Sequence, residues 1–237
     1  MKILMGVVIL LLVLGGGYYL LTTRAPGGSG NGNATSTPIE VVVATRTINE
    51  ETPTLLIDAE YPQFGLPAEA SAQAGISSIN AQIETIVRDS VDSFKKDTEA
   101  APPSPVDAKY EFVSVFDPPY IGNDAISVRL IVSTYTGGAH PMAYLNGLNF
   151  ERASGRLLTL SDALAMVDLQ LSDVAAESLR QMRARHGEGL FADGLVATPE
   201  NYGTFIVDGT KVTFVFQLYQ IAAYAAGFQE VSFARKK

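Results

Sequence analysis

Apolar and polar residues alternate along several short stretches of the chain, which is the pattern of a strand with one buried face. The clearest stretch is 124–135, where Ile126, Val128, Leu130 and Val132 alternate with mostly polar neighbours. The same pattern predicts further strands, bounded by turn-forming residues, at 39–48, 54–61, 109–116, 144–151, 204–207, 211–218 and 229–233.

Two longer stretches carry helical spacing instead. Between residues 68 and 99 the apolar side chains recur every three or four positions, and the prolines of 101–105 end the pattern. A second helix is predicted over about 164–185, with a start signal at Ser161 and Asp162. Two main helices among runs of strands predict an α+β fold with mainly antiparallel sheets.

The N-terminus has the character of a membrane anchor. An apolar run extends over residues 3–21, and a helix of that length spans about 28 Å, close to the hydrocarbon thickness of a bilayer. Tyr18 and Tyr19 stand at its outer end, where aromatic rings prefer the interface. We expect a single uncleaved signal anchor with Met1 and Lys2 in the cytoplasm; the alternative is a cleaved signal peptide.

The organisation that follows is a tether and a folded region. Residues 24–38 are rich in Gly, Ser, Thr, Asn and Pro, with no large apolar side chain, so they are expected to form a flexible linker. We therefore divide the chain into a transmembrane anchor at 1–23, the linker at 24–38, an N-terminal subdomain at 39–120 and a C-terminal subdomain at 121–237.

Charge and composition exclude several classes of function. The chain of 237 residues has 17 basic and 25 acidic side chains and a net charge of −8, so binding to nucleic acid is not expected. The whole acidic excess lies in residues 39–151, with 6 basic and 16 acidic side chains. There is no cysteine and there are only two histidines, so no metal site and no cofactor are expected.

One of the two histidines stands in a loop that also contains two glycines. His140 follows Gly137 and Gly138, of which at least one is expected to have a positive φ or to lie against another backbone. We expect Gly138→Val to destabilise the fold for that reason. His140 itself has three open interpretations: a structural loop residue, part of a binding surface, or a general base. The structural one is favoured, and it predicts that His140→Ala loses stability.

The order of several short motifs resembles a known family. They are Tyr135-Thr-Gly-Gly-Ala-His140-Pro, Leu148-Asn-Phe150, Gly155-Arg-Leu-Leu-Thr-Leu-Ser-Asp162, Phe214-Val-Phe216 and Tyr219-Gln-Ile-Ala-Ala-Tyr224. Together with upstream matches they cover about residues 50–235. The chain resembles the extracytoplasmic domain of RsiV-type anti-sigma factors and the N-terminal module of PdaC-type peptidoglycan deacetylases.

The resemblance implies two packed subdomains outside the membrane, near the cell wall, and in RsiV-type proteins this part binds lysozyme. Only Met1 and Lys2 precede the apolar run, and the sequence has no deacetylase motif with paired histidines. We therefore expect a binding module of the bacterial envelope, anchored in the cytoplasmic membrane with a periplasmic or extracytoplasmic domain. It would not be an enzyme, and its partner would be a cell-wall glycan or a basic, lysozyme-like envelope protein. The alternative is a peptidoglycan hydrolase or deacetylase using His140. The expected binding residues are Tyr135, Gly137, Gly138, His140, Tyr219 and Tyr224.

Overall fold

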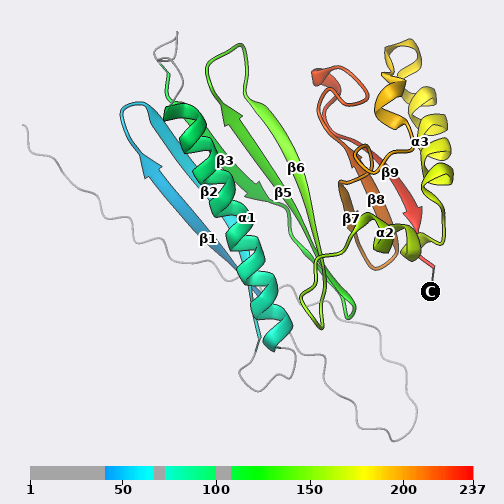
Figure 1. Ribbon diagram of the computed structural model, residues 1–237, viewed down its shortest axis with the longest axis horizontal. Helices are drawn as coiled ribbons and strands as arrows, with labels where there is room; N and C mark the ends of the chain where they lie inside the picture. Colours follow the sequence, from blue (N-terminus) through cyan, green and yellow to red (C-terminus); the bar gives the residue numbers. More distant parts are fainter. Residues whose placement is uncertain (1–40, 67–72, 100–107, 237) are drawn as a thin grey trace, which may run out of the picture. The chain divides into compact units, whose positions relative to one another are not determined.

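The computed structural model describes residues 41–66, 73–99 and 108–236, and residues 38–237 form one compact unit. It confirms an α+β fold (Figure 1). The strands are β1 Val42–Glu51, β2 Leu55–Gly65, β3 Tyr110–Phe116, β4 Tyr120–Ile121, β5 Ala125–Tyr135, β6 Met142–Glu151, β7 Phe205–Val207, β8 Lys211–Phe216 and β9 Gln229–Ala234. The α-helices are α1 Gln73–Glu99, α2 Leu160–Val167 and α3 Leu171–His186, and short 3₁₀ turns lie at Gly187–Gly189, Ala192–Leu195 and Tyr224–Ala226.

The larger sheet runs in the order β1-β2-β3-β5-β4, with β6 on the other side of β5. All its neighbours are antiparallel except β2 and β3, which run parallel. The sheet is therefore mixed, because α1 connects β2 to β3 and returns the chain to the end at which β2 began. The expected subdomain boundary between residues 120 and 121 falls within β4, inside this sheet.

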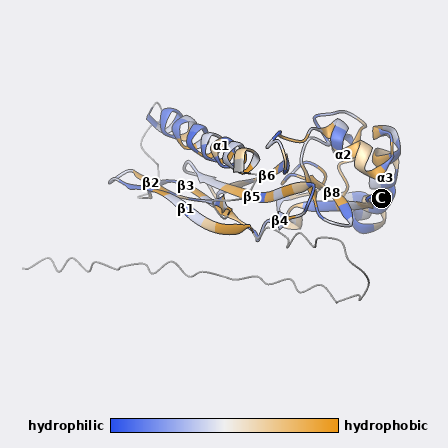
Figure 2. Cartoon of the chain, turned by 90° about the horizontal axis from the view of Figure 1, so that it is seen from below, coloured by the Kyte–Doolittle hydropathy of each residue, from blue (hydrophilic) through white to orange (hydrophobic). Residues whose placement is uncertain are grey.

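Helix α1 covers one face of this sheet, and in Figure 2 its outward side is mostly hydrophilic. Its inner side carries Ile76, Ile79, Ile83 and Val87, which are buried against side chains of β2, β3, β5 and β6. These are the positions that the helical spacing predicted. Burying several isoleucines and valines at roughly 1.5–3 kcal/mol each is what holds the helix on the sheet.

The smaller sheet has the order β7-β8-β9 and encloses a second hydrophobic cluster with α2 and α3. The predicted single helix over 164–185 is wrong, because the chain forms two helices. The first begins at Leu160, where Thr159 makes a capping box with Asp162, and it ends at Asp168 in the left-handed conformation, φ 56°. An aspartate tolerates that conformation better than most residues, so no glycine or proline marks the break.

A buried polar joint connects the two sheets. Asn149 on β6 is fully buried, and its side-chain amide donates to the carbonyl oxygen of Phe205 at 2.7 Å. Its Oδ1 accepts from the Ser127 hydroxyl at 2.6 Å and from the Val207 amide at 3.1 Å. Because Ser127 and Asn149 belong to the larger sheet and Phe205 and Val207 to the smaller one, these bonds fix the position of β7 against β6.

The expected anchor at residues 3–21 and linker at 24–38 lie outside the described residues. Among the helices at 73–99 and 160–186, none is both long and apolar enough to cross a bilayer.

Candidate functional site

The loop between β5 and β6 holds the residues that the sequence singled out. Gly137 has φ 83°, which confirms that one of the two glycines occupies the left-handed region. Tyr135 closes the loop, since its hydroxyl donates to the Gly138 carbonyl oxygen at 3.1 Å. Gly138 has open space where a Cβ would stand, so the prediction that Gly138→Val strains the fold is wrong. The positive φ makes Gly137 the position where a side chain is strained.

His140 is exposed and stacks on Tyr224, with ring centroids 4.1 Å apart and an interplanar angle of 31°. The carbonyl oxygen of Pro141 accepts a hydrogen bond from the Tyr224 hydroxyl at 3.0 Å. The same oxygen lies 2.9 Å from Nδ1 of His140. Since a carbonyl oxygen only accepts, this contact requires the hydrogen on Nδ1, which leaves Nε2 as a free acceptor in the neutral ring.

Tyr219 extends this arrangement. Its ring centroid lies 5.5 Å from that of Tyr224, its side chain is 47% exposed, and its backbone has φ 64°. A non-glycine residue rarely adopts that conformation without support from its surroundings. We name the three rings of His140, Tyr224 and Tyr219 the aromatic stack.

All six expected binding residues therefore meet at one end of the β5–β6 hairpin. Tyr135, Gly137, Gly138 and His140 come from the loop itself. Tyr219 and Tyr224 come from the segment between β8 and β9, and Tyr224 is 83 residues from the Pro141 that it contacts. What the stack offers chemically is a partly exposed aromatic surface of mutually tilted rings, with one ring nitrogen and hydroxyl groups at its edge.

The contacts of His140 that the structure shows are the ring of Tyr224 and the carbonyl oxygen of Pro141. Across 41–66, 73–99 and 108–236, no group of three or more His, Asp or Glu side chains is arranged to hold a metal ion.

A shallow groove of about 460 Å³ lies near the same loop, on the side of helix α1. It is lined by α1, by Phe112 of β3, and by Thr134 and Thr136 at the end of β5. The sequence analysis did not single out its two carboxylates, Asp89 and Asp97. The signal was the spacing of Asp89, Ser93 and Asp97, which are four residues apart and so share one flank of the helix.

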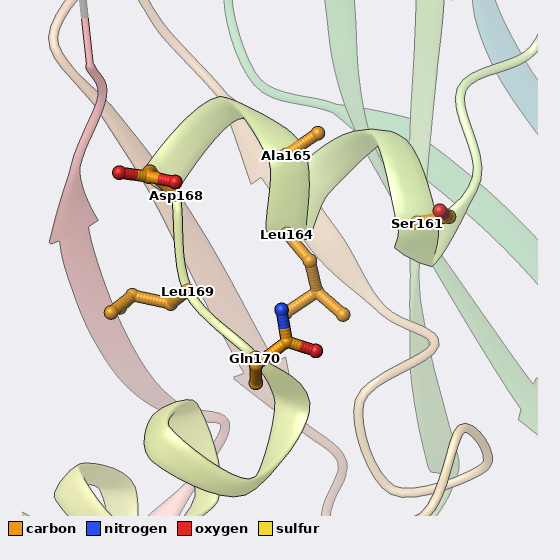
Figure 3. Close-up of a pocket in the computed structure, with 6 residues that line it drawn as sticks. All are labelled: Ser161, Leu164, Ala165, Asp168, Leu169 and Gln170. Atoms are coloured by element: carbon orange, nitrogen blue, oxygen red, sulfur yellow. The ribbon is translucent and has the colours of Figure 1, made fainter.

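A second hollow of about 250 Å³ lies where α2 turns into α3 (Figure 3). It is lined by Ser161, Leu164, Ala165, Asp168, Leu169 and Gln170. Its shape follows from the left-handed Asp168, which bends the chain between the two helices.

Two family models match the chain in succession. Residues 48–143 match the model described as "Deacetylase PdaC", and residues 167–236 match the model described as "Protein of unknown function (DUF3298)". The chain is thus similar to both families, each over one part of its length. This confirms the resemblance derived from the motifs. The PdaC match ends at residue 143, so it includes β5 and the His140 loop.

Solved structures of DUF3298 proteins share the fold. One from Pseudomonas aeruginosa PAO1 is 13% identical with a TM-score of 0.54, over 84% of this chain and 95% of that one. One from Bacteroides fragilis NCTC 9343 is 19% identical with a TM-score of 0.51, over 83% and 91%. No curated protein matches the sequence. The fold is therefore shared over more than four fifths of the chain.

Proposed function

We propose that this protein is a binding module of the bacterial envelope. It recognises a cell-wall glycan or a wall-active protein such as lysozyme and has no catalytic step of its own. The observation that carries the proposal is the aromatic stack. His140 and Tyr219 are exposed, and the rings of both contact Tyr224. Aromatic faces of this kind bind the C–H faces of sugar rings, and the hydroxyl groups and ring nitrogen at the edge supply hydrogen bonds.

The acidic character of residues 39–151 supports the protein branch of the proposal, because a net charge of −10 attracts basic partners. Glycan binding and lysozyme binding differ in their salt dependence. Long-range attraction to a basic protein is screened at high salt, whereas stacking of a neutral sugar is not.

The test uses the full-length protein in mild detergent with insoluble peptidoglycan and, separately, with lysozyme. Tyr219→Ala and Tyr224→Ala are expected to reduce retention on the ligand that the stack recognises. Phe191→Ala is the matched control, because Phe191 is as exposed as Tyr219, at 47%. Retention unchanged in both tyrosine variants would contradict a role for the stack. Release of soluble glycan fragments or acetate would favour the hydrolase or deacetylase alternative.

We further propose that residues 3–21 anchor the protein in the cytoplasmic membrane, with residues 39–237 on the outer side. The length and apolar character of the run support this placement. Removing residues 1–38 is expected to give a soluble protein, while the full chain stays with the membrane fraction and is digested by protease added to the outer side. Aggregation of the truncated chain would place the boundary elsewhere.

A further inference from the structure

The groove beside α1 has an aromatic floor. Phe94 of α1 and Phe112 of β3 are 6% and 2% exposed, and their ring centroids lie 5.6 Å apart at an angle of 54°. Both line the groove, together with hydroxyl-bearing residues from each side: Ser90, Ser93, Thr134 and Thr136. Figure 1 shows the C-terminal part of α1 beside the end of the β5–β6 hairpin.

Two exposed carboxylates stand along one rim. Asp89 and Asp97 are eight residues apart on α1, which separates them by about 12 Å along the helix axis. Within the described part of the chain, neither of these carboxylates makes a hydrogen bond or ion pair. Two cations of the same helix have other partners, since Arg88 pairs with Glu84 and Lys95 with Glu50 of β1.

An exposed aromatic ring stands on the opposite side. Phe112, Thr134 and Met142 are paired across β3, β5 and β6, so their side chains share one face of the sheet. Tyr144 lies two positions after Met142 on β6, which places it on the same face. Its side chain is 50% exposed, so the sheet surface next to the groove presents a free ring.

We propose that this groove binds a glycan carrying free amino groups, that is, an amino-sugar chain from which N-acetyl groups have been removed. Asp89 and Asp97 would pair with ammonium groups, the serine and threonine hydroxyls with sugar hydroxyls, and Tyr144 with a ring face. The spacing of the two residues along the helix axis, about 12 Å, is close to the length of a disaccharide unit. Acetylation removes the positive charge, so the fully acetylated chain offers these carboxylates no cation to pair with.

The inference rests on the proposed function in taking a cell-wall glycan as the ligand class, and it adds a second site with a chemical preference. The test titrates the full-length protein with the β-1,4-linked glucosamine tetramer and with its fully N-acetylated counterpart. We expect tighter binding of the free amine. The double variant Asp89→Asn/Asp97→Asn should weaken binding of the amine by about two- to tenfold and leave binding of the acetylated tetramer unchanged.

Asp92→Asn is the matched control. It removes one negative charge from the same helix, as each substitution of the double variant does, but Asp92 does not line the groove. An equal loss in the control would show general attraction of cations and overturn the proposal. Equal affinity for both tetramers would also overturn the proposal. So would tight binding of an oligolysine of equal charge that depends on the same two aspartates, because that result would indicate a basic protein as the ligand.

The two proposals fail separately. If peptidoglycan is retained through Tyr219 and Tyr224 while the amine preference is absent, only the groove inference is wrong. If the amine preference is present and the tyrosine variants retain peptidoglycan normally, the aromatic stack is not the site of recognition.

Discussion

The side-chain amide of Gln217 pairs with the main chain of Leu145 in the way that a neighbouring strand would. Its Oε1 accepts from the Leu145 amide at 3.0 Å, and its Nε2 donates to the Leu145 carbonyl oxygen at 2.8 Å. Among the described strands, β6 pairs only with β5, so its outer edge needs other partners. Gln217 directly follows β8 and precedes the segment of Tyr219 and Tyr224, so this pairing ties the aromatic stack to β6.

The first prediction concerns this pairing. Gln217→Leu should lower the free energy of unfolding by about 1–3 kcal/mol, because the Leu145 amide and carbonyl lose their partners in a largely buried setting. Urea denaturation measures the change. Gln217→Glu provides a sharper comparison, because a carboxylate keeps the acceptor but loses the donor, and a protonated carboxyl restores it. Gln217→Glu should therefore regain part of its deficit on acidification, and a deficit that grows at low pH would contradict the pairing.

The β5–β6 loop gives a matched pair of glycine variants. Gly137→Ala should destabilise the protein by about 1 kcal/mol, because φ 83° is strained for a residue with a Cβ. Gly138→Ala should change stability by less than about 0.5 kcal/mol, because nothing lies within 4 Å of the added carbon. Thermal melts of the two variants compare them directly. If Gly138→Ala proves the more damaging, the loop conformation described for residues 136–141 is incorrect.

The start of α2 predicts a pH dependence. Hydrogen bonds from Arg156, and from the amide and hydroxyl of Thr159, lower the pKa of the Asp162 carboxyl well below its usual value. A lowered pKa in the folded state means that the carboxylate stabilises the fold at pH values above its unfolded pKa, about 3.9. That contribution is lost as the pH falls through the folded pKa.

Asp162→Asn should accordingly lower the unfolding free energy by about 1 kcal/mol at pH 7, through loss of the ion pair and part of the capping box. The difference from the unsubstituted protein should shrink as the pH drops below about 4. Chemical denaturation at pH 7, 5 and 3 would follow it, if the protein stays folded at the lowest pH. Asp173→Asn, at the start of α3, serves as the comparison. A difference that stays constant with pH would mean that the charge of Asp162 contributes nothing.

Local patterns in the sequence predicted most elements of the fold. Alternation around Ile126, Val128 and Leu130 located β5, because a strand with one buried face has apolar residues at every second position. The break between α2 and α3 at Asp168 was not predicted, because the sequence of two amphipathic segments joined by a left-handed aspartate looks like that of one continuous helix. The parallel pairing of β2 with β3 was not predicted either, because it depends on which strands meet in space.

The candidate site was also predicted only in part. The two glycines and His140 were visible as a loop, and the motif order supplied Tyr219 and Tyr224 through resemblance. The stacking of His140 on Tyr224 was not predictable, because it joins segments that no local spacing connects. The Leu148-Asn149-Phe150 motif acquires a structural reason, since Asn149 connects the two sheets. The groove needs the packing of α1 over β3 and β5, which composition alone does not give.

The last prediction separates a structural role of His140 from a contact role. The sequence favoured a structural role, with loss of stability in His140→Ala. The structure changes that expectation: the imidazole is exposed and has one ring and one carbonyl oxygen as partners. His140→Ala should therefore change stability by less than about 1 kcal/mol, because an exposed ring contact and a solvent-facing hydrogen bond contribute little. Retention on the ligand of the stack should fall, because one face of the aromatic surface is removed.

Tyr224→Phe completes the comparison, since it keeps the stacking with His140 and removes the hydrogen bond to Pro141. If stacking is what the ligand recognises, Tyr224→Phe should retain most of the binding that His140→Ala loses, and both variants should melt within a few degrees of the parent. A large drop in melting temperature for His140→Ala, with binding reduced only in proportion to the folded fraction, would instead make His140 a structural residue. Normal binding by both variants would remove the loop from the recognition surface and leave the groove beside α1 as the remaining candidate.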